Sequence, residues 1–210
     1  TDAHRSTTVT VQNGGVLELA TWTYGSGDSL GMLTADTGAI VVNTGTIRVT
    51  GSTSYGRGVV LNGPATLEAA AGANWTINVT SDNRNWTYNN NAIELAGAGT
   101  GTFQKNFSGS GGVTKSGSGT WTLSGTNTYS GTTAINAGTL KLAAISSVSN
   151  SPTINVASGA VFNVAAVSGY TVQPKQTLAG SGMVTGAVTV ASGGILAAGG
   201  TNATGTLSFS

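Results

Sequence analysis

The chain has 210 residues, of which 39% are hydrophobic and 7% charged, and its formal net charge at pH 7 is +1. This length and apolar content are enough to bury a core, which excludes an intrinsically disordered protein. The small net charge argues against nucleic acid as a partner, and the absence of cysteine excludes disulfides and thiolate metal sites. No apolar run reaches the roughly 18 residues of a membrane helix, so we expect no membrane-spanning segment.

One phrase recurs along the chain: an apolar alternation, a glycine turn and a second alternation. Copies lie at 9–20, 39–51, 58–69, 133–143, 153–165 and 187–199. Alternation with period two predicts two β-strands per phrase, each with one buried face. A recurrence of roughly 20 to 35 residues is the length of one coil of a parallel β-helix. The sequence therefore predicts an all-β fold, a parallel β-helix (β-solenoid) forming one domain over 1–210.

An antiparallel sandwich is the competing fold. It predicts Asn-Gly or Asp-Gly hairpins between strands. The chain has two such pairs, Asn13-Gly14 and Asn62-Gly63, and both lie inside the repeated phrase. This position favours the stacked coil.

Outward residues of the phrases should form ladders, because successive coils stack about 4.8 Å apart. These residues are Glu18, Arg48, Glu68, Lys141 and Asn163. The first three alternate in charge along the predicted ladder, and each exposed pair should stabilise the fold by under about 1 kcal/mol.

Residues 73–91 differ from the rest in holding two of the four tryptophans beside polar groups. The segment is predicted to be an inserted hairpin or a widened coil. Flat aromatic rings beside amides and a guanidinium suit contact with a glycan or a protein partner. The candidate contact residues are Trp75, Asp82, Asn83, Arg84, Trp86 and Tyr88. Packing is the favoured alternative, because each tryptophan shares a strand face with the large apolar or aromatic residue two positions later.

No residue is assigned a catalytic, cofactor or metal role. His4, the one histidine, lies near the terminus, where catalytic geometry is poorly held. The acids are scattered, and Arg48 is expected between Glu18 and Glu68, which disfavours a paired-carboxylate glycosidase. Residues 109–116 are glycine-rich, but Thr114 replaces the glycine that a phosphate loop needs before its lysine.

Residues 111–142 read GGVTKSGSGTWTLSGTNTYSGTTAINAGTLKL. This stretch resembles the autotransporter-associated β-strand repeat, also called the passenger-associated transport repeat. The matching positions are Gly111, Gly112, Lys115, Gly117, Gly119, Thr120, Leu123, Gly125, Asn127, Tyr129, Gly131, Thr132, Gly138, Leu140 and Leu142. The resemblance implies a right-handed parallel β-helix, secreted by a bacterium to the cell surface or its surroundings.

We therefore expect a non-enzymatic structural protein whose subunits stack head to tail into a surface fibre or sheath. The acids and arginines up to Glu94 give −7 + 4 = −3, and the four later lysines give +4, an asymmetry that favours polar stacking. The predicted junction consists of Thr8, Val9, Val11, Leu207 and Phe209. The alternatives are a fragment of an autotransporter passenger acting as an adhesin stalk, with surface glycans or other surface proteins as partners, and a polysaccharide-acting enzyme.

Overall fold

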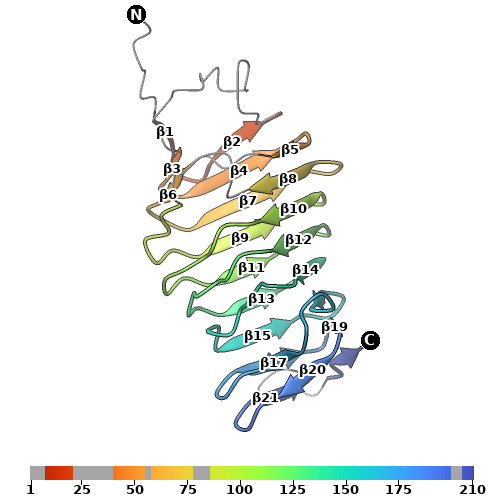
Figure 1. Cartoon of the computed structure of the whole chain (residues 1–210). Helices are drawn as coiled ribbons and strands as arrows, with labels where there is room; N and C mark the ends of the chain where they lie inside the picture. The colour runs from red at the N-terminus through yellow and green to blue at the C-terminus, as the bar shows by residue number, and fades with distance from the viewer. Residues whose placement is uncertain (1–7, 21–39, 55–57, 78–85, 200–204) are drawn as a thin grey trace, which may run out of the picture.

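The structure is a computed structural model, and it describes residues 8–20, 40–54, 58–77, 86–199 and 205–210. The described residues form short strands and turns without a helix. Every strand pair is parallel. Successive coils stack into an elongated rod with β1 and β2 at one end and β20 and β21 at the other (Figure 1). This architecture confirms the predicted parallel β-solenoid.

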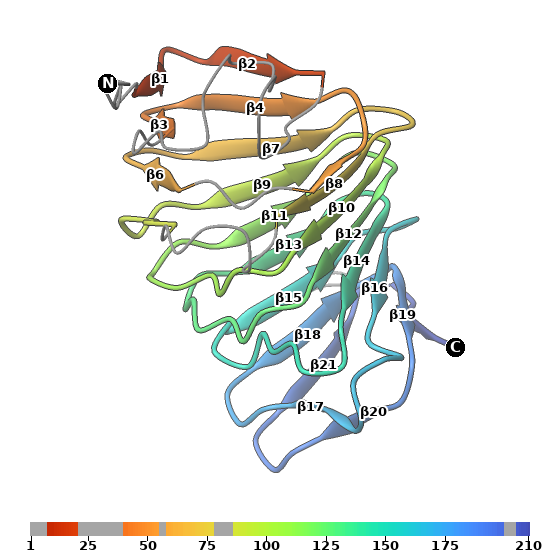
Figure 2. The same cartoon turned by 45° about the horizontal axis from the view of Figure 1, so that its top comes forward.

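The rod has three sides. The first is a nine-stranded sheet of β2 (Gly15–Leu19), β4 (Gly45–Val49), β7 (Ala65–Ala69), β9 (Ile93–Ala96), β11 (Val113–Lys115), β13 (Thr133–Ile135), β15 (Thr153–Val156), β18 (Thr177–Gly180) and β21 (Ile195–Ala198). The second is an eight-stranded sheet of β5 (Thr53–Ser54), β8 (Asn74–Ile77), β10 (Thr100–Phe103), β12 (Thr120–Leu123), β14 (Thr139–Leu142), β16 (Val161–Asn163), β19 (Met183–Thr185) and β22 (Ser208–Phe209). Figure 2 shows these two sheets meeting along one edge of the rod.

The third side carries shorter strands. Near the amino-terminal end it has β1 (Val9–Val11), β3 (Ile40–Val42) and β6 (Val59–Leu61), and near the other end β17 (Tyr170–Val172) and β20 (Val188–Val190). Between these groups the described chain crosses as turns and irregular segments, with isolated parallel bridges from Val60 to Thr87 and from Thr126 to Ser147.

Alternation along the strands of the inner coils places every second side chain inside the rod. In β9, for example, Ile93 and Leu95 are buried and Glu94 lies outward. Aromatic side chains stack along the interior: Trp75 meets Trp121 edge to face at 5.7 Å, and Tyr88 meets Phe107 at 4.7 Å between ring centroids. The core is thus one continuous column rather than a set of separate clusters.

Gly101 shows how tightly this column is packed. It pairs in register with Trp75 on one neighbouring coil and with Trp121 on the other. A Cβ atom at position 101 would lie 2.3 Å from the Trp121 ring, closer than any side chain tolerates. Glycine is therefore required here because the indole of Trp121 occupies the side-chain space of its neighbour.

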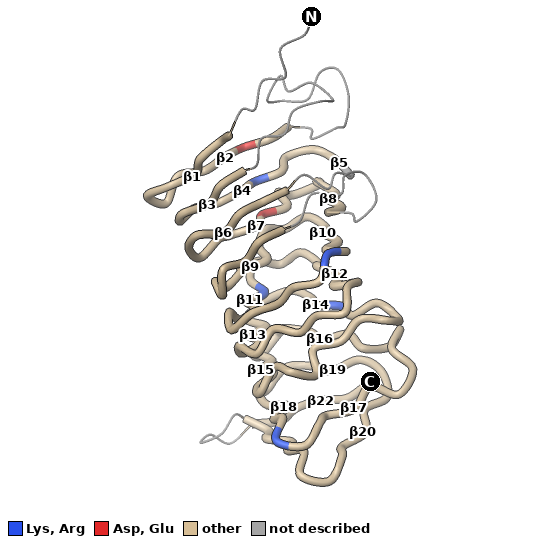
Figure 3. The backbone as a smooth tube through the Cα atoms, turned by 60° about the vertical axis from the view of Figure 1, so that its left-hand side comes forward, with Lys and Arg blue, Asp and Glu red and all other residues tan. Residues whose placement is uncertain are grey.

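The predicted charge ladder is present. Arg48 pairs in register with Glu18 and with Glu68. Its guanidinium lies 3.3 Å from Glu18 and 2.9 Å from Glu68, between nitrogen and oxygen atoms. Figure 3 shows this acid–base–acid column on β2, β4 and β7. After Glu94 of β9, all charged residues of the chain are lysines.

The six phrases do not occupy the same corner, which corrects the expectation of one common ladder. The copies at 9–20, 39–51, 58–69 and 187–199 join the third side to the nine-stranded sheet, whereas those at 133–143 and 153–165 join the nine-stranded sheet to the eight-stranded one. Lys141 and Asn163 therefore pair with each other on the eight-stranded sheet, away from Glu68. The reason is physical: a glycine turn between two alternations closes either corner equally well.

Candidate binding face on the nine-stranded sheet

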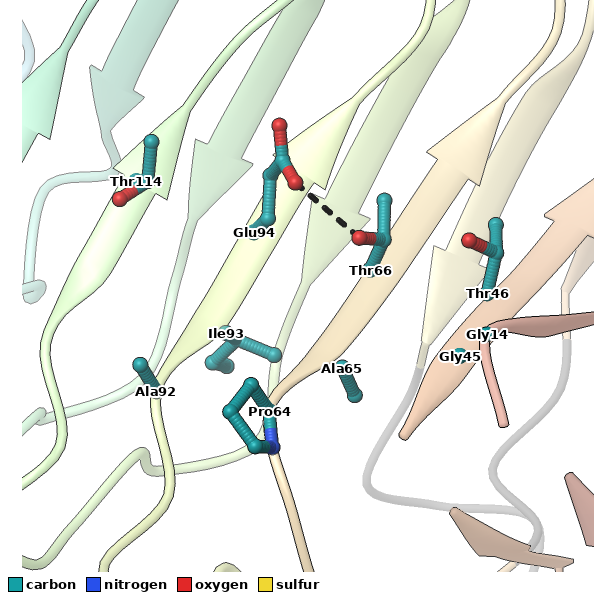
Figure 4. A pocket seen from close by; sticks show the side chains of 10 residues that line it. All are labelled: Gly14, Gly45, Thr46, Pro64, Ala65, Thr66, Ala92, Ile93, Glu94 and Thr114. Carbon is teal, nitrogen blue, oxygen red and sulfur yellow. Dashed lines mark hydrogen bonds between the residues drawn. The ribbon is translucent and has the colours of Figure 1, made fainter. Parts of the chain in front are cut away.

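The outer face of the nine-stranded sheet carries a groove of about 440 Å³ near its amino-terminal half (Figure 4). Four outward residues of successive coils run along it, and the parallel register aligns each with the next: Thr46, Thr66, Glu94 and Thr114. The remaining lining residues are Gly14, Gly45, Pro64, Ala65, Ala92 and Ile93. The groove is therefore a product of coil stacking, since its polar residues come from four separate turns.

Glu94 is the only acid among the residues that line this groove. The Thr66 hydroxyl donates a hydrogen bond to Oε2 of Glu94 at 3.1 Å, and the Ser116 hydroxyl donates to Oε1. The two donors come from the coils on either side of β9. They hold the half-buried carboxylate in one orientation, facing out of the sheet (Figure 4).

The charge ladder lies beside the groove, two residues further along the same strands. Arg48 contacts both Glu18 and Glu68, so its guanidinium is shared by two carboxylates. It also stands between them, as the sequence predicted. Both carboxylates are therefore paired with the guanidinium that lies between them.

The aromatic contact residues predicted in 73–91 lie in the core. Trp75, Trp86 and Tyr88 are 0%, 8% and 5% exposed. Trp86 packs edge to face on Phe103 at 5.2 Å, and burial raises the pKa of Tyr88. Their burial favours the packing interpretation for the rings.

The polar members of that set, Asp82, Asn83 and Arg84, lie outside the described residues, as does His4. A depression of about 380 Å³ borders the segment. It is lined by Trp86, Thr87, Tyr88, Asn89, Asn90, Ser108 and Gly109. Contact of this segment with a glycan or partner stays a prediction.

The predicted junction residues lie at the two ends of the described rod. Thr8 is exposed and Val11 is buried, with half-buried Val9 between exposed neighbours. At the other end Phe209 is 49% exposed, and Leu207 packs partly on the core. A contact between subunits at these residues stays a prediction.

Sequence reasoning missed a buried lysine. Lys115 has no exposed surface, and its ammonium donates to the carbonyl oxygens of Ser116 at 2.5 Å, Gly117 at 2.8 Å and Ala137 at 3.2 Å. Burial lowers the pKa of Lys115 to about 8. The available signal was its inward position in the alternation Val113–Thr114–Lys115, where an apolar residue is expected.

Asn127 is a second buried polar group without an assigned role in the sequence analysis. Its amide accepts from the backbone N–H of Phe107 at 2.9 Å and donates to the carbonyls of Gly125 at 3.0 Å and Ser147 at 3.1 Å. These bonds link three coils at the corner between the eight-stranded sheet and the third side. The amide substitutes for the ladder hydrogen bonds that the turn there cannot make.

With the fold and these corner contacts in place, the comparison with known proteins is decisive over one stretch. Residues 113–142 match the family model described as Passenger-associated-transport-repeat. The chain carries a passenger-associated transport repeat. Lys115 and Asn127 both lie within the repeat, and the buried contacts above account for a charged and an amide residue at those positions.

A longer stretch of the chain is similar to a known adhesin. The Adhesin BmaC autotransporter of Brucella suis biovar 1 (strain 1330) is 38% identical over 121 residues, which cover 56% of this chain and 4% of the adhesin. The chain thus spans a small fraction of that relative's length. No solved structure matches the chain significantly. The family match and the adhesin indicate a bacterial surface or extracellular protein.

Within the described residues, no helix is long and apolar enough to cross a membrane. In the same part of the chain, no group of three or more His, Cys, Asp or Glu side chains is placed to hold a metal ion.

Proposed function

We propose that this chain is a non-enzymatic stalk segment of a bacterial autotransporter adhesin. The observation that carries the proposal is the 38% identity to an autotransporter adhesin over 121 residues, together with the passenger-associated transport repeat at 113–142. In this role the solenoid acts as a spacer, and a binding region elsewhere in the longer protein is held away from the cell.

The physical character of the rod supports a spacer. Backbone pairing joins each coil only to its neighbours, so length can be added by further coils of the same kind. Parallel backbone ladders on three sides and a continuous aromatic column resist bending. The exposed charges on described residues are few, and the Arg48 guanidinium is paired with both Glu18 and Glu68.

The experiment is a pair of in-frame changes in the parent gene of the source bacterium. One removes residues 1–210, and the other duplicates them. We expect antibody against the chain to label intact cells, with cell attachment reduced by the deletion and retained by the duplication. Labelling only after the cells are permeabilised would overturn the surface role. Full attachment by the deletion strain would overturn the spacer role.

A head-to-tail fibre is the second candidate, favoured by one observation. The last described coil exposes apolar side chains that another coil would cover: Val190 is 39% exposed, Ile195 51%, Leu196 46% and Phe209 49%. In this candidate β21 and β22 pair with the first strands of the next subunit.

Electron microscopy and sedimentation of the purified chain separate the two candidates. Filaments that disappear when residues 206–210 are deleted would support the fibre and its junction. Single rods at all protein concentrations would exclude the fibre and support the stalk segment. A filament that survives the deletion would place the junction elsewhere.

A further inference from the structure

We propose that the groove around Glu94 binds a neutral saccharide. The proposal concerns the outer face of the nine-stranded sheet and stands apart from the stalk role, which depends on the length and rigidity of the rod. Its basis is the arrangement of one fixed carboxylate, a line of hydroxyl groups and an apolar ledge in a single groove (Figure 4).

The Glu94 carboxylate has unused acceptor capacity in a fixed position. A carboxylate offers about four lone-pair sites, and the hydroxyls of Thr66 and Ser116 occupy one on each oxygen. Two acceptor sites therefore remain for a ligand. Because both protein donors are anchored on the two adjacent coils, the carboxylate loses little freedom when a ligand binds, which favours affinity.

The remaining groove supplies what a sugar ring requires on its other edges. Thr46 and Thr114 lie at the two ends of the polar line, and each hydroxyl can both donate and accept. Pro64 and Ala92 are exposed and lie along one side of the groove, where they form an apolar ledge (Figure 4). A saccharide combines hydroxyl donors with an apolar C–H face, and a volume of about 440 Å³ suits one or two rings.

Charge on this face selects against other ligands. Glu94 carries a full negative charge, and the neighbouring ladder of Glu18, Arg48 and Glu68 adds a net −1, so anionic sugars and phosphates are repelled. A calcium ion takes six to eight oxygen ligands, typically several of them carboxylates, and Glu94 is the single carboxylate lining the groove. A compact amine is the closest competitor, since one carboxylate can hold it by charge alone.

The test is saturation-transfer NMR on the full 210-residue chain. The probes are maltose, lactose and diacetylchitobiose as neutral saccharides, and lysine amide as the competing cation. We expect saturation of at least one disaccharide by the wild-type chain. Glu94→Ala should weaken that binding by about tenfold or more, because it removes the charge-assisted acceptor of the groove. Glu94→Gln keeps one acceptor oxygen, so its affinity for the disaccharide should lie between those of the wild type and Glu94→Ala.

Thr122→Ala is the matched control, because Thr122 is an outward, half-exposed hydroxyl of β12 on the eight-stranded sheet. It should bind like the wild type. If Glu94→Ala loses its cooperative thermal unfolding, Thr114→Val replaces it as the test variant. The proposal would be overturned if none of the three disaccharides received saturation from the wild-type chain, or if Glu94→Ala bound them as well as the wild type does. It would also be overturned if lysine amide were the one probe that received saturation. None of these results affects the attachment assay for the stalk.

Discussion

Lys115 should make this protein more stable as the pH rises from 7 to 9.5. Its ammonium is sealed inside the rod, where it donates to the carbonyls of Ser116, Gly117 and Ala137. Burial disfavours the charged form and lowers the pKa of Lys115 from 10.5 to about 8 in the folded chain. In the unfolded chain the pKa returns to its ordinary value.

The sign follows from proton binding. Below pH 8 both states hold the proton, and the full cost of burying the charge is present. Between pH 8 and 10.5 the folded state releases the proton first, so the free energy of unfolding increases. The gap between the two pKa values corresponds to about 3 kcal/mol, of which about 2 kcal/mol should appear between pH 7 and 9.5. The three carbonyl acceptors stabilise the ammonium, which makes this the upper end of the expected gain.

The assay is urea unfolding at pH 7 and 9.5 for the wild type and Lys115→Met. The range stops at 9.5 because burial raises the pKa values of Tyr88, Tyr129 and Tyr170, so unfolded tyrosines ionise first at higher pH and destabilise the fold. We expect the wild type to gain about 2 kcal/mol and the variant to show no such gain. Equal pH dependence in the two proteins would refute the reasoning, whatever their absolute stabilities.

The remaining predictions concern the core and its corners. Gly101→Ala should destabilise the chain by about 1–3 kcal/mol, because the added methyl would lie 2.3 Å from the Trp121 ring. The same substitution should cost less in thermal unfolding when it is made in a Trp121→Leu background, where the clash is removed. Asn127→Ala should lower the free energy of unfolding by about 1–3 kcal/mol, because its buried backbone partners become unsatisfied. Asn106→Ala, at an exposed site with an equivalent bond to the backbone, should lower it by under about 1 kcal/mol. Equal losses of the two variants in urea unfolding would contradict the role of burial. Trp86→Ala should cost about 3–5 kcal/mol if its role is packing, and a variant that stays folded but loses a ligand would support contact instead.

The fold was predictable because its signal is local. The apolar–polar alternation around Glu18, Arg48 and Glu68 predicts which side chains face outward, and the repetition of the phrase predicts that coils stack. The register of the first three coils and their charge ladder followed from that pattern alone. The similarity of 111–142 to a known repeat implied the same parallel architecture independently, and the structure agrees over that stretch.

The corners were not predictable in the same way. The phrases around Glu68 and Lys141 have the same local form, yet one turns onto the nine-stranded sheet and the other away from it. A phrase contains no information about which of three sides it begins on, because that depends on every earlier turn. The carbonyl partners of the buried Lys115 were not predictable for a related reason. They belong to turns, and the pattern of side chains in the sequence does not show where turn carbonyls point.

The groove around Glu94 depends on the same accumulated register. Its four outward residues, Thr46, Thr66, Glu94 and Thr114, are separated by 20, 28 and 20 residues, as their positions in the chain give. The long interval spans 73–91, so that segment must return the chain to the sheet with Glu94 outward. A shift of one residue on return would turn Glu94 into the core and expose the apolar side chains beside it. The core of β9 therefore fixes the carboxylate in the groove, and a change that preserves the fold must preserve the position of Glu94 as well.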